Sequence, residues 1–176
     1  LGSLMLIAPT KLHPLWYTTW IPVEFFTSAM GAGMSVLVFI TLAYAWLYGK
    51  GRNMPMITGM ARGSAALLLV YAALKIADFT VHGKWSYVAG ENVSWETYVW
   101  LAESALFVVI PVFIYLVPKL RNNVAALTAG SLSAAIGLLM HRIDTGIVGY
   151  FRDAGQVYYP SISEISLSLG VFAAAG

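Results

Sequence analysis

Four ionisable side chains lie inside apolar stretches of this sequence, and their types suit proton transfer. Lys75, Asp78 and His82 are spaced i, i+3 and i+7, which places them on one face of a helix within about two turns. At about 1.5 Å per residue, Lys75 lies about 10 Å from the helix end, and Glu103 reaches a similar depth in the next apolar stretch. A charge inside a membrane costs about 2.5 kcal/mol or more, so such residues usually face a protein interior and often mark proton routes. We therefore predict that Asp78, His82 and Glu103 form a proton relay and that Lys75 sets its local charge.

A purely structural role explains the same cluster equally well. Lys75 can form ion pairs with Asp78 and with Glu103, and pairing is a common solution to the cost of burying charges. The substitution Asp78→Asn separates the two interpretations. If Asp78 transfers protons, we expect this variant to lose turnover while its assembly stays intact.

The remaining histidines and Arg142 are weaker candidates. His13 lies in a loop and is predicted to contact the membrane interface or the headgroup of a membrane ligand, and Arg142 to make structural or headgroup contacts. A b-type haem needs two histidines on facing helices at similar depth. His82 and His141 both end helices in the sequence pattern instead of lying inside an apolar span. We therefore expect neither haem ligation nor a metal site.

The amino-acid composition indicates the class of protein in which these residues lie. Of the 176 residues, 10% are charged and 59% hydrophobic, whereas a soluble domain has about 25% charged residues. This excludes an ordinary water-soluble enzyme domain and a disordered chain. The absence of cysteine excludes a disulfide scaffold and an iron–sulfur cluster held by this chain. The chain has a net charge of +2 and no long basic stretch, so it is not expected to bind nucleic acid. Its high hydrophobic fraction makes a lipid bilayer the expected partner.

Long apolar stretches predict an all-α, polytopic transmembrane helix bundle with about five spans. Crossing the hydrocarbon core takes about 20 residues per helix. After an outer-face loop at residues 1–19, the expected helices cover residues 20–48, 62–82, 97–117, 123–141 and 161–176, the last of them truncated. We interpret the chain as a fragment of a longer subunit, because it starts without Met and stops inside an apolar stretch.

The loops predict the orientation. Loops 49–55 and 118–123 contain lysine and arginine but no acid, whereas the longer loops mix both charges, so the positive-inside rule places the two short loops in the cytoplasm. Nearly every membrane-embedded charge then belongs to the outer half of the bundle. A transporter would carry its polar site near the midplane. The charge placement therefore favours a proton-coupled redox site that opens to the outer face.

Aromatic side chains concentrate on the outer face. Five of the six tryptophans lie there: Trp16, Trp20, Trp85, Trp95 and Trp100. This distribution is typical of an interfacial belt that anchors helices at the membrane surface. Long aromatic loops of mixed charge can also form a docking platform for a partner, and the two roles are compatible.

The segment from Gly2 to Trp16, with His13-Pro14-Leu15-Trp16 as its most specific part, closely resembles a signature of the NrfD/HybB family. Residues 118–123, 141–150 and 158–161 with Glu164 resemble further segments of that family in the same order. The resemblance spans most of the chain and corresponds to the later half of such a subunit. HybB-type hydrogenase subunits and DsrP-type subunits are the most similar members, and polysulfide reductase is more remote.

The resemblance implies an integral membrane subunit of a respiratory oxidoreductase complex in the inner (cytoplasmic) membrane. A ferredoxin-like iron–sulfur subunit and a catalytic subunit would dock on the outer face. Electrons would pass between that iron–sulfur subunit and menaquinone or ubiquinone, without haem or an iron–sulfur cluster in this chain. The subunit would not be catalytic alone. The alternatives are an ion or proton transporter-like subunit, a haem-bearing cytochrome b anchor and a purely structural anchor.

Overall fold

The computed structural model describes residues 12–91, 93–146 and 166. Within these residues the chain is all-helical, and four helical runs are long and apolar enough to cross a membrane. They confirm the predicted transmembrane bundle. The expected fifth span at 161–176 and residues 1–11 of the outer loop lie outside the described residues.

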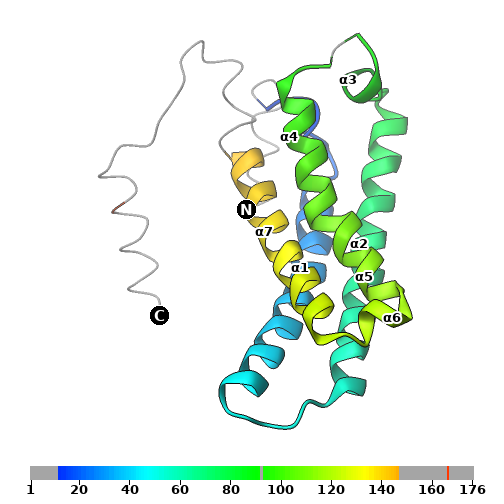
Figure 1. Ribbon diagram of the computed structural model, residues 1–176. Coiled ribbons are helices and arrows are strands. Elements are labelled where there is room, and N and C mark those ends of the chain that lie inside the picture. Colours follow the sequence, from blue (N-terminus) through cyan, green and yellow to red (C-terminus); the bar gives the residue numbers. More distant parts are fainter. Residues whose placement is uncertain (1–11, 92, 147–165, 167–176) are drawn as a thin grey trace.

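The four spans are joined in simple chain order (Figure 1). The first two are α1 (Ile21–Leu47) and α2 (Met54–Val81), and the last is α7 (Val124–Gly146). The third span consists of three consecutive pieces: α4 (Trp95–Ser104), a π-turn η2 (Ala105–Val109) and α5 (Ile110–Leu116). Two short helices, α3 (Ser86–Ala89) and α6 (Pro118–Arg121), lie in the connections.

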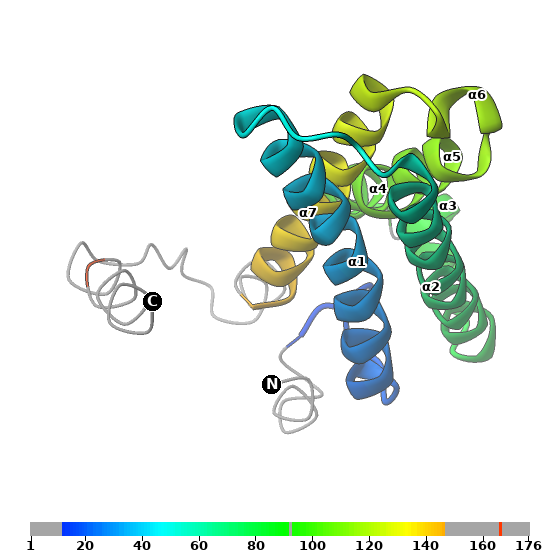
Figure 2. The same cartoon turned by 90° about the horizontal axis from the view of Figure 1, so that it is seen from below.

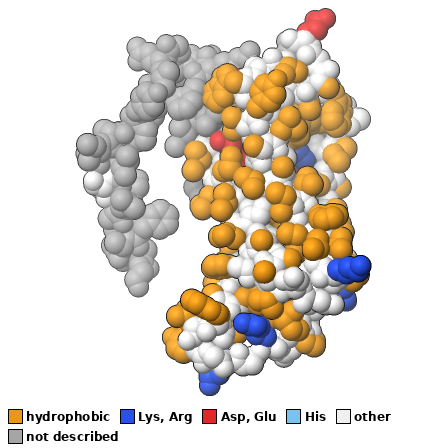
Figure 3. Space-filling view, viewed as in Figure 1, with side chains coloured by type: hydrophobic (Ala, Val, Ile, Leu, Met, Phe, Trp, Pro, Cys, Tyr) orange, Lys and Arg blue, Asp and Glu red, His pale blue; other side chains and the backbone are white. Residues whose placement is uncertain are grey.

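The spans form a ring in which α1 packs against α2 and α7, and the third span closes the gap between those two (Figure 2). Apolar residues fill the ring at three levels, with Val38, Ile57 and Tyr115 at one end and Leu15 and Phe79 at the other. Large apolar side chains also cover much of the visible outer surface (Figure 3). A bundle apolar on both sides is expected where lipid or further helices surround it.

Two helix boundaries differ from the sequence-based expectation. Helix α2 begins at Met54 and not at residue 62, because the Asn53 side chain accepts a hydrogen bond from Met56 N at 3.3 Å. Pro55 lies in this first turn, where its missing N–H costs nothing. Helix α7 continues to Gly146. The prediction that His141 ends its helix is therefore wrong, and His141 lies inside a span.

Glycines end the first two spans. Gly49 and Gly83 have φ angles of +59° and +63°, a conformation that residues with a Cβ adopt at a cost. In both cases the next amide, that of Lys50 or Lys84, donates back into the last helical turn. The chain therefore reverses sharply at both ends of the bundle. Each reversal sets the direction in which the lysine after the glycine leaves the helix.

Candidate functional site

A buried carboxylate lies in the half of the bundle that ends at α3 and at the segment before α1. We call this half the outer half, after the orientation predicted from the sequence. One oxygen of Glu103, in α4, accepts a hydrogen bond from Trp16 Nε1 at 3.1 Å, and the other lies 2.5 Å from His141 Nδ1 of α7. The exposed fractions are 2% for Glu103, 1% for Trp16 and 3% for His141. A carboxyl group and an imidazole in contact can pass a proton from one to the other while the pair stays neutral overall.

The third span changes its pitch directly after this carboxylate. The Ile110 amide donates to the carbonyl five residues back, so Ala105–Val109 forms a π-turn. The next amide in that pattern would belong to Pro111, which has no N–H, so the carbonyl of Leu106 has no donor from its own helix. Ser133 Oγ of α7 donates to that carbonyl at 2.7 Å. Such turns are frequent at functional sites, and this one fastens the third span to α7.

Gly137 lets α7 pack directly against the backbone of the π-turn. A Cβ at this position would lie 2.5 Å from the N and Cα atoms of Phe107. His141 lies four residues further along on the same face of α7. Its ring stacks on the Phe107 ring, with centroids 6.2 Å apart and planes at 8°. The close approach at Gly137 therefore sets how His141 meets Glu103.

The substitution Gly137→Ala is expected to force α7 away from the π-turn, because the backbone of Phe107 cannot rotate aside. Overpacking of this kind costs about 1–3 kcal/mol, so the thermal unfolding midpoint of the purified complex should fall. Gly33→Ala is the matched control, since nothing lies within 4 Å of its added Cβ. It should leave the midpoint unchanged or raise it. Equal midpoints for the two variants would contradict the close packing at Gly137.

A second buried carboxylate, Asp78 of α2, lies nearer the outer end. One of its oxygens accepts a hydrogen bond from Thr18 Oγ1 at 2.5 Å and lies 2.9 Å from His82 Nδ1. The other oxygen lies 2.6 Å from Lys84 Nζ. Asp78 has no exposed surface, whereas the side chain of His82 is 39% exposed. His82 therefore connects a fully buried carboxylate to the exposed surface at this end of the bundle.

Lys84 reaches Asp78 from the connection after α2. The left-handed conformation of Gly83 turns the chain back, and Lys84 Nζ also donates to the carbonyl of Tyr17 at 2.6 Å. Burial lowers the pKa of Lys84 from its ordinary value of 10.5, and the hydrogen bond and charge of Asp78 oppose that shift. The charge of this buried lysine therefore depends on Asp78.

The third buried pair joins α1 to α2. Lys75 Nζ lies 3.1 Å from Glu24 Oε2, with side-chain exposures of 8% and 2%. The other oxygen, Glu24 Oε1, is buried and has no hydrogen-bond partner among the described residues. The ion pairs predicted between Lys75 and either Asp78 or Glu103 are wrong, because each of those carboxylates pairs with a different residue.

Arg142 fastens the outer end of α7 to α1. Its Nη2 donates to the carbonyl of Phe25 at 3.2 Å and to Ser28 Oγ at 3.0 Å, and the guanidinium lies 3.6 Å from the Phe25 ring centroid. Three buried atoms nearby on α7 make no hydrogen bond within the described part of the chain: Arg142 Nη1, His141 Nε2 and Asp144 Oδ2. Helix α7 therefore offers hydrogen-bonding capacity that the described residues do not use.

The segment before α1 folds onto the outer end of the bundle. His13 Nδ1 accepts a hydrogen bond from Leu15 N at 3.2 Å, and its ring makes edge contacts with Trp16 and Tyr87. Because this turn buries Trp16, the indole N–H reaches Glu103. Trp16, expected in an interfacial belt, is therefore buried within the bundle, and His13 is buried beside it.

The structure brings together some of the predicted site residues. Asp78 and His82 contact each other, whereas Lys75 and Glu103 each pair with a residue on another helix. Sequence reasoning missed several partners: Trp16, Thr18, Glu24, Lys84, and His141 as the partner of Glu103. Glu24 carries a usable signal, because it is the only acid in the long apolar stretch of α1 and a lone buried acid requires a cation.

Four apolar spans around a buried polar network define a multi-pass membrane protein. The family described as polysulphide reductase, NrfD, matches residues 4–151, which is most of the chain. The chain belongs to this family, and the resemblance found in the sequence is confirmed.

Two curated relatives extend this assignment. A protein of Nitratidesulfovibrio vulgaris strain Hildenborough is 32% identical over 178 residues, covering 96% of this chain and 45% of that protein. The probable Ni/Fe-hydrogenase 2 b-type cytochrome subunit of Escherichia coli K12 is 28% identical over 176 residues, covering 98% of this chain and 44% of that subunit. The chain therefore spans less than half the length of these relatives. No solved structure matches it.

The name of the Escherichia coli relative makes haem a group to test against the histidines of this chain. The His141 ring is stacked on Phe107 and lies 5.9 Å from Tyr71, centroid to centroid, and its Nδ1 is bound to Glu103. His82 is bound to a different carboxylate at the exposed end of α2. These two residues do not fit a haem held between a pair of histidines. Among the described residues, no three His, Asp or Glu side chains are placed to hold a metal ion.

Proposed function

We propose that this chain is part of a membrane subunit that exchanges electrons between a docked iron–sulfur protein and the quinone pool, with menaquinone or ubiquinone as the bound substrate. The observation that carries the proposal is the Glu103–His141 pair, buried inside two spanning helices. Membership of the NrfD family and the named hydrogenase relative also support it. Reduction of a quinone to a quinol takes up two protons with two electrons, so a quinone subunit requires a proton supply.

The three buried pairs suggest a route for those protons. His82 is exposed and contacts Asp78, so these two residues exchange protons at the outer surface. Glu103 and His141 then deliver protons to a quinone oxygen. Lys75 is the buried cation paired with Glu24, and we assign it the role of setting the charge along the route.

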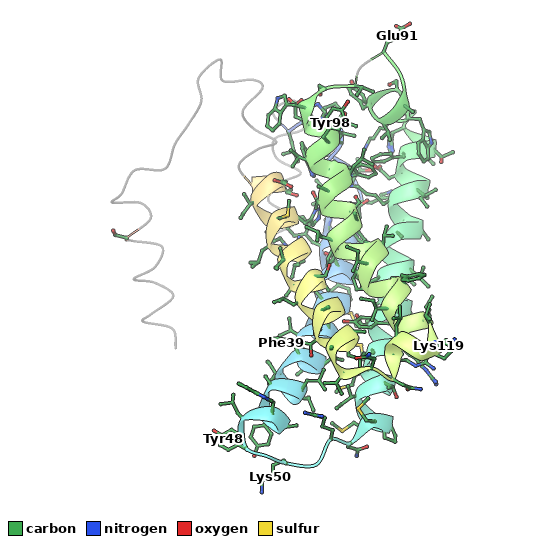
Figure 4. All side chains as sticks on the ribbon, viewed as in Figure 1. Phe39, Tyr48, Lys50, Glu91, Tyr98 and Lys119 are labelled. Carbon is green, nitrogen blue, oxygen red and sulfur yellow. The ribbon has the colours of Figure 1, made fainter. Side chains whose placement is uncertain are left out.

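The orientation follows from the charges at the two ends. We place loops 49–55 and 118–123 on the cytoplasmic side of the inner membrane, because they carry lysine and arginine without any acid. The iron–sulfur and catalytic partners would then dock at the opposite end, around α3. Exposed aromatic side chains lie near that end of the chain's helices: Trp85, Trp95 and Tyr98. Figure 4 labels Tyr98 there.

Purification of the full-length subunit from native membranes in mild detergent tests the proposed partners. We expect a multi-cysteine iron–sulfur protein and a catalytic subunit to co-purify and to be identified by mass spectrometry. The complex should also transfer electrons to or from an added quinone analogue. Isolation of the subunit alone, or only with itself, would contradict the proposal and favour a transporter-like subunit.

A further inference from the structure

The end of the bundle farthest from the buried ionisable pairs carries two adjoining cavities of different character. We propose that together they bind an anionic phospholipid. The phosphate lies beside Lys50 and Arg52, and one acyl chain lies in the groove between α1 and α7. This inference does not depend on the proposed redox function.

The first cavity has a volume of about 530 Å³ and is suited to an anion. Its lining includes Lys50, Arg52 and Asn122. Neither basic side chain forms a hydrogen bond or ion pair within the part of the chain that the structure describes. Met54 and Val124, the first residues of α2 and α7, also line it, so the positive ends of two long helices add to the field.

The second cavity has a volume of about 310 Å³ and is suited to hydrocarbon. It shares Trp46, Arg52 and Val124 with the first cavity, so the two adjoin. The rest of its lining comes from α1 and α7: Phe39, Leu42, Ala43, Leu47 and Thr128. Only Arg52 and Thr128 in this lining are polar. A ligand with an anionic head and an apolar tail matches both cavities, whereas free phosphate matches only the first.

Charge complementarity at this end favours a lipid headgroup. The six acids among the described residues all lie in the opposite half, whereas Lys50, Arg52, Lys119 and Arg121 gather here. Figure 3 shows basic side chains at this end and an exposed acidic side chain at the other. Basic pockets between transmembrane helices on the cytoplasmic side are suited to acidic lipid headgroups.

The depth of the cavities also agrees with a lipid. Helices α1 and α2 have 27 and 28 residues, a length of about 40 Å against a hydrocarbon core of about 30 Å. The helices are therefore long enough for their joined ends, where Lys50 and Tyr48 lie in Figure 4, to reach the headgroup layer. Trp46 and Tyr48 are 74% and 66% exposed, and such side chains prefer the membrane interface.

Native mass spectrometry of the intact, full-length complex, titrated with phosphatidylglycerol and separately with phosphatidylcholine, tests the proposal. We expect the wild type to retain phosphatidylglycerol at least about tenfold more tightly than phosphatidylcholine. Lys50→Gln and Arg52→Gln should each weaken that retention about fivefold, the effect of removing one cation near an acidic lipid. Lys119→Gln removes the same charge from the same end without lining either cavity, and it should have little effect.

The groove is tested separately by Ala43→Phe, which fills the apolar cavity and should weaken phosphatidylglycerol retention at least about tenfold. Ala66→Phe, at an exposed position on α2, is the control for added bulk and should not change it. Three outcomes would overturn the proposal. The first is equal losses in the Arg52 and Lys119 variants, which indicate general surface charge. The second is displacement of the lipid by inorganic phosphate. The third is that the wild type does not retain phosphatidylglycerol more tightly than phosphatidylcholine, as expected if other polypeptide of the complex covers this surface.

Discussion

Replacing Glu103 by glutamine is expected to lower the quinone-linked turnover of the intact complex by about 100-fold or more. An amide keeps the size of the side chain and can still bond to Trp16 and His141, but it cannot hold an exchangeable proton. General acid–base catalysis by a positioned group contributes about 10²–10⁴-fold to a rate, which sets the scale of the loss. The measurement is turnover with a quinone analogue and the physiological electron donor, compared at equal amounts of assembled complex.

Two controls make this experiment specific. Electron transfer from the donor to a soluble dye bypasses the quinone, so it should be unchanged in Glu103→Gln. Glu91→Gln removes a carboxylate from the exposed connection at the outer end, and quinone-linked turnover should stay at the wild-type level (Figure 4). Wild-type turnover in Glu103→Gln would reduce the Glu103–His141 pair to a structural contact.

Replacing Asp78 by asparagine is expected to lower the free energy of unfolding by about 3 kcal/mol. The variant leaves Lys84 buried without its carboxylate, and removal of one partner of a buried pair costs about 3–5 kcal/mol. The sequence alone predicts that this variant assembles normally, and the burial of Lys84 against Asp78 changes that expectation. Thermal unfolding of the purified complex measures the effect.

The pH dependence identifies Lys84 as the cause of that loss. In the folded wild type, the pKa of Lys84 lies below its value of 10.5 in the unfolded chain. Between the folded-state and the unfolded-state pKa, the unfolded chain binds more protons, so stability rises with pH. Without Asp78 the folded-state pKa falls further, so Asp78→Asn should be less destabilised at pH 9 than at pH 7. Adding Lys84→Met should restore most of the stability and remove this dependence. The same deficit at both pH values would contradict the assignment.

The spans could be predicted from the sequence because a backbone in lipid must satisfy its own hydrogen bonds, which leaves helices as the solution for apolar stretches of this length. Their ends depend on weaker local signals. Asn53 and Pro55 start α2 inside a stretch that composition alone marks as loop. The continuation of α7 to Gly146 has a larger consequence, because it places His141 within the span.

The pairing of the buried charges could not be predicted, because it depends on which faces of different helices meet. Lys75 and Asp78 share one face of α2, yet Lys75 pairs with Glu24 of α1 and Asp78 with Lys84 beyond the helix end. Helix spacing reports only neighbours on the same helix. The turn after Gly83, which returns Lys84 to the bundle, is set by backbone conformation and not by hydropathy.

The central claim is that Glu103 changes its protonation during quinone chemistry. Infrared difference spectroscopy of the intact complex, recorded as bound quinone is reduced, observes carboxyl groups directly. We expect a carboxyl signal that shifts in D₂O, that persists in Glu91→Gln and that is absent from Glu103→Gln. Difference spectra that are identical in the wild type and in Glu103→Gln would contradict the claim.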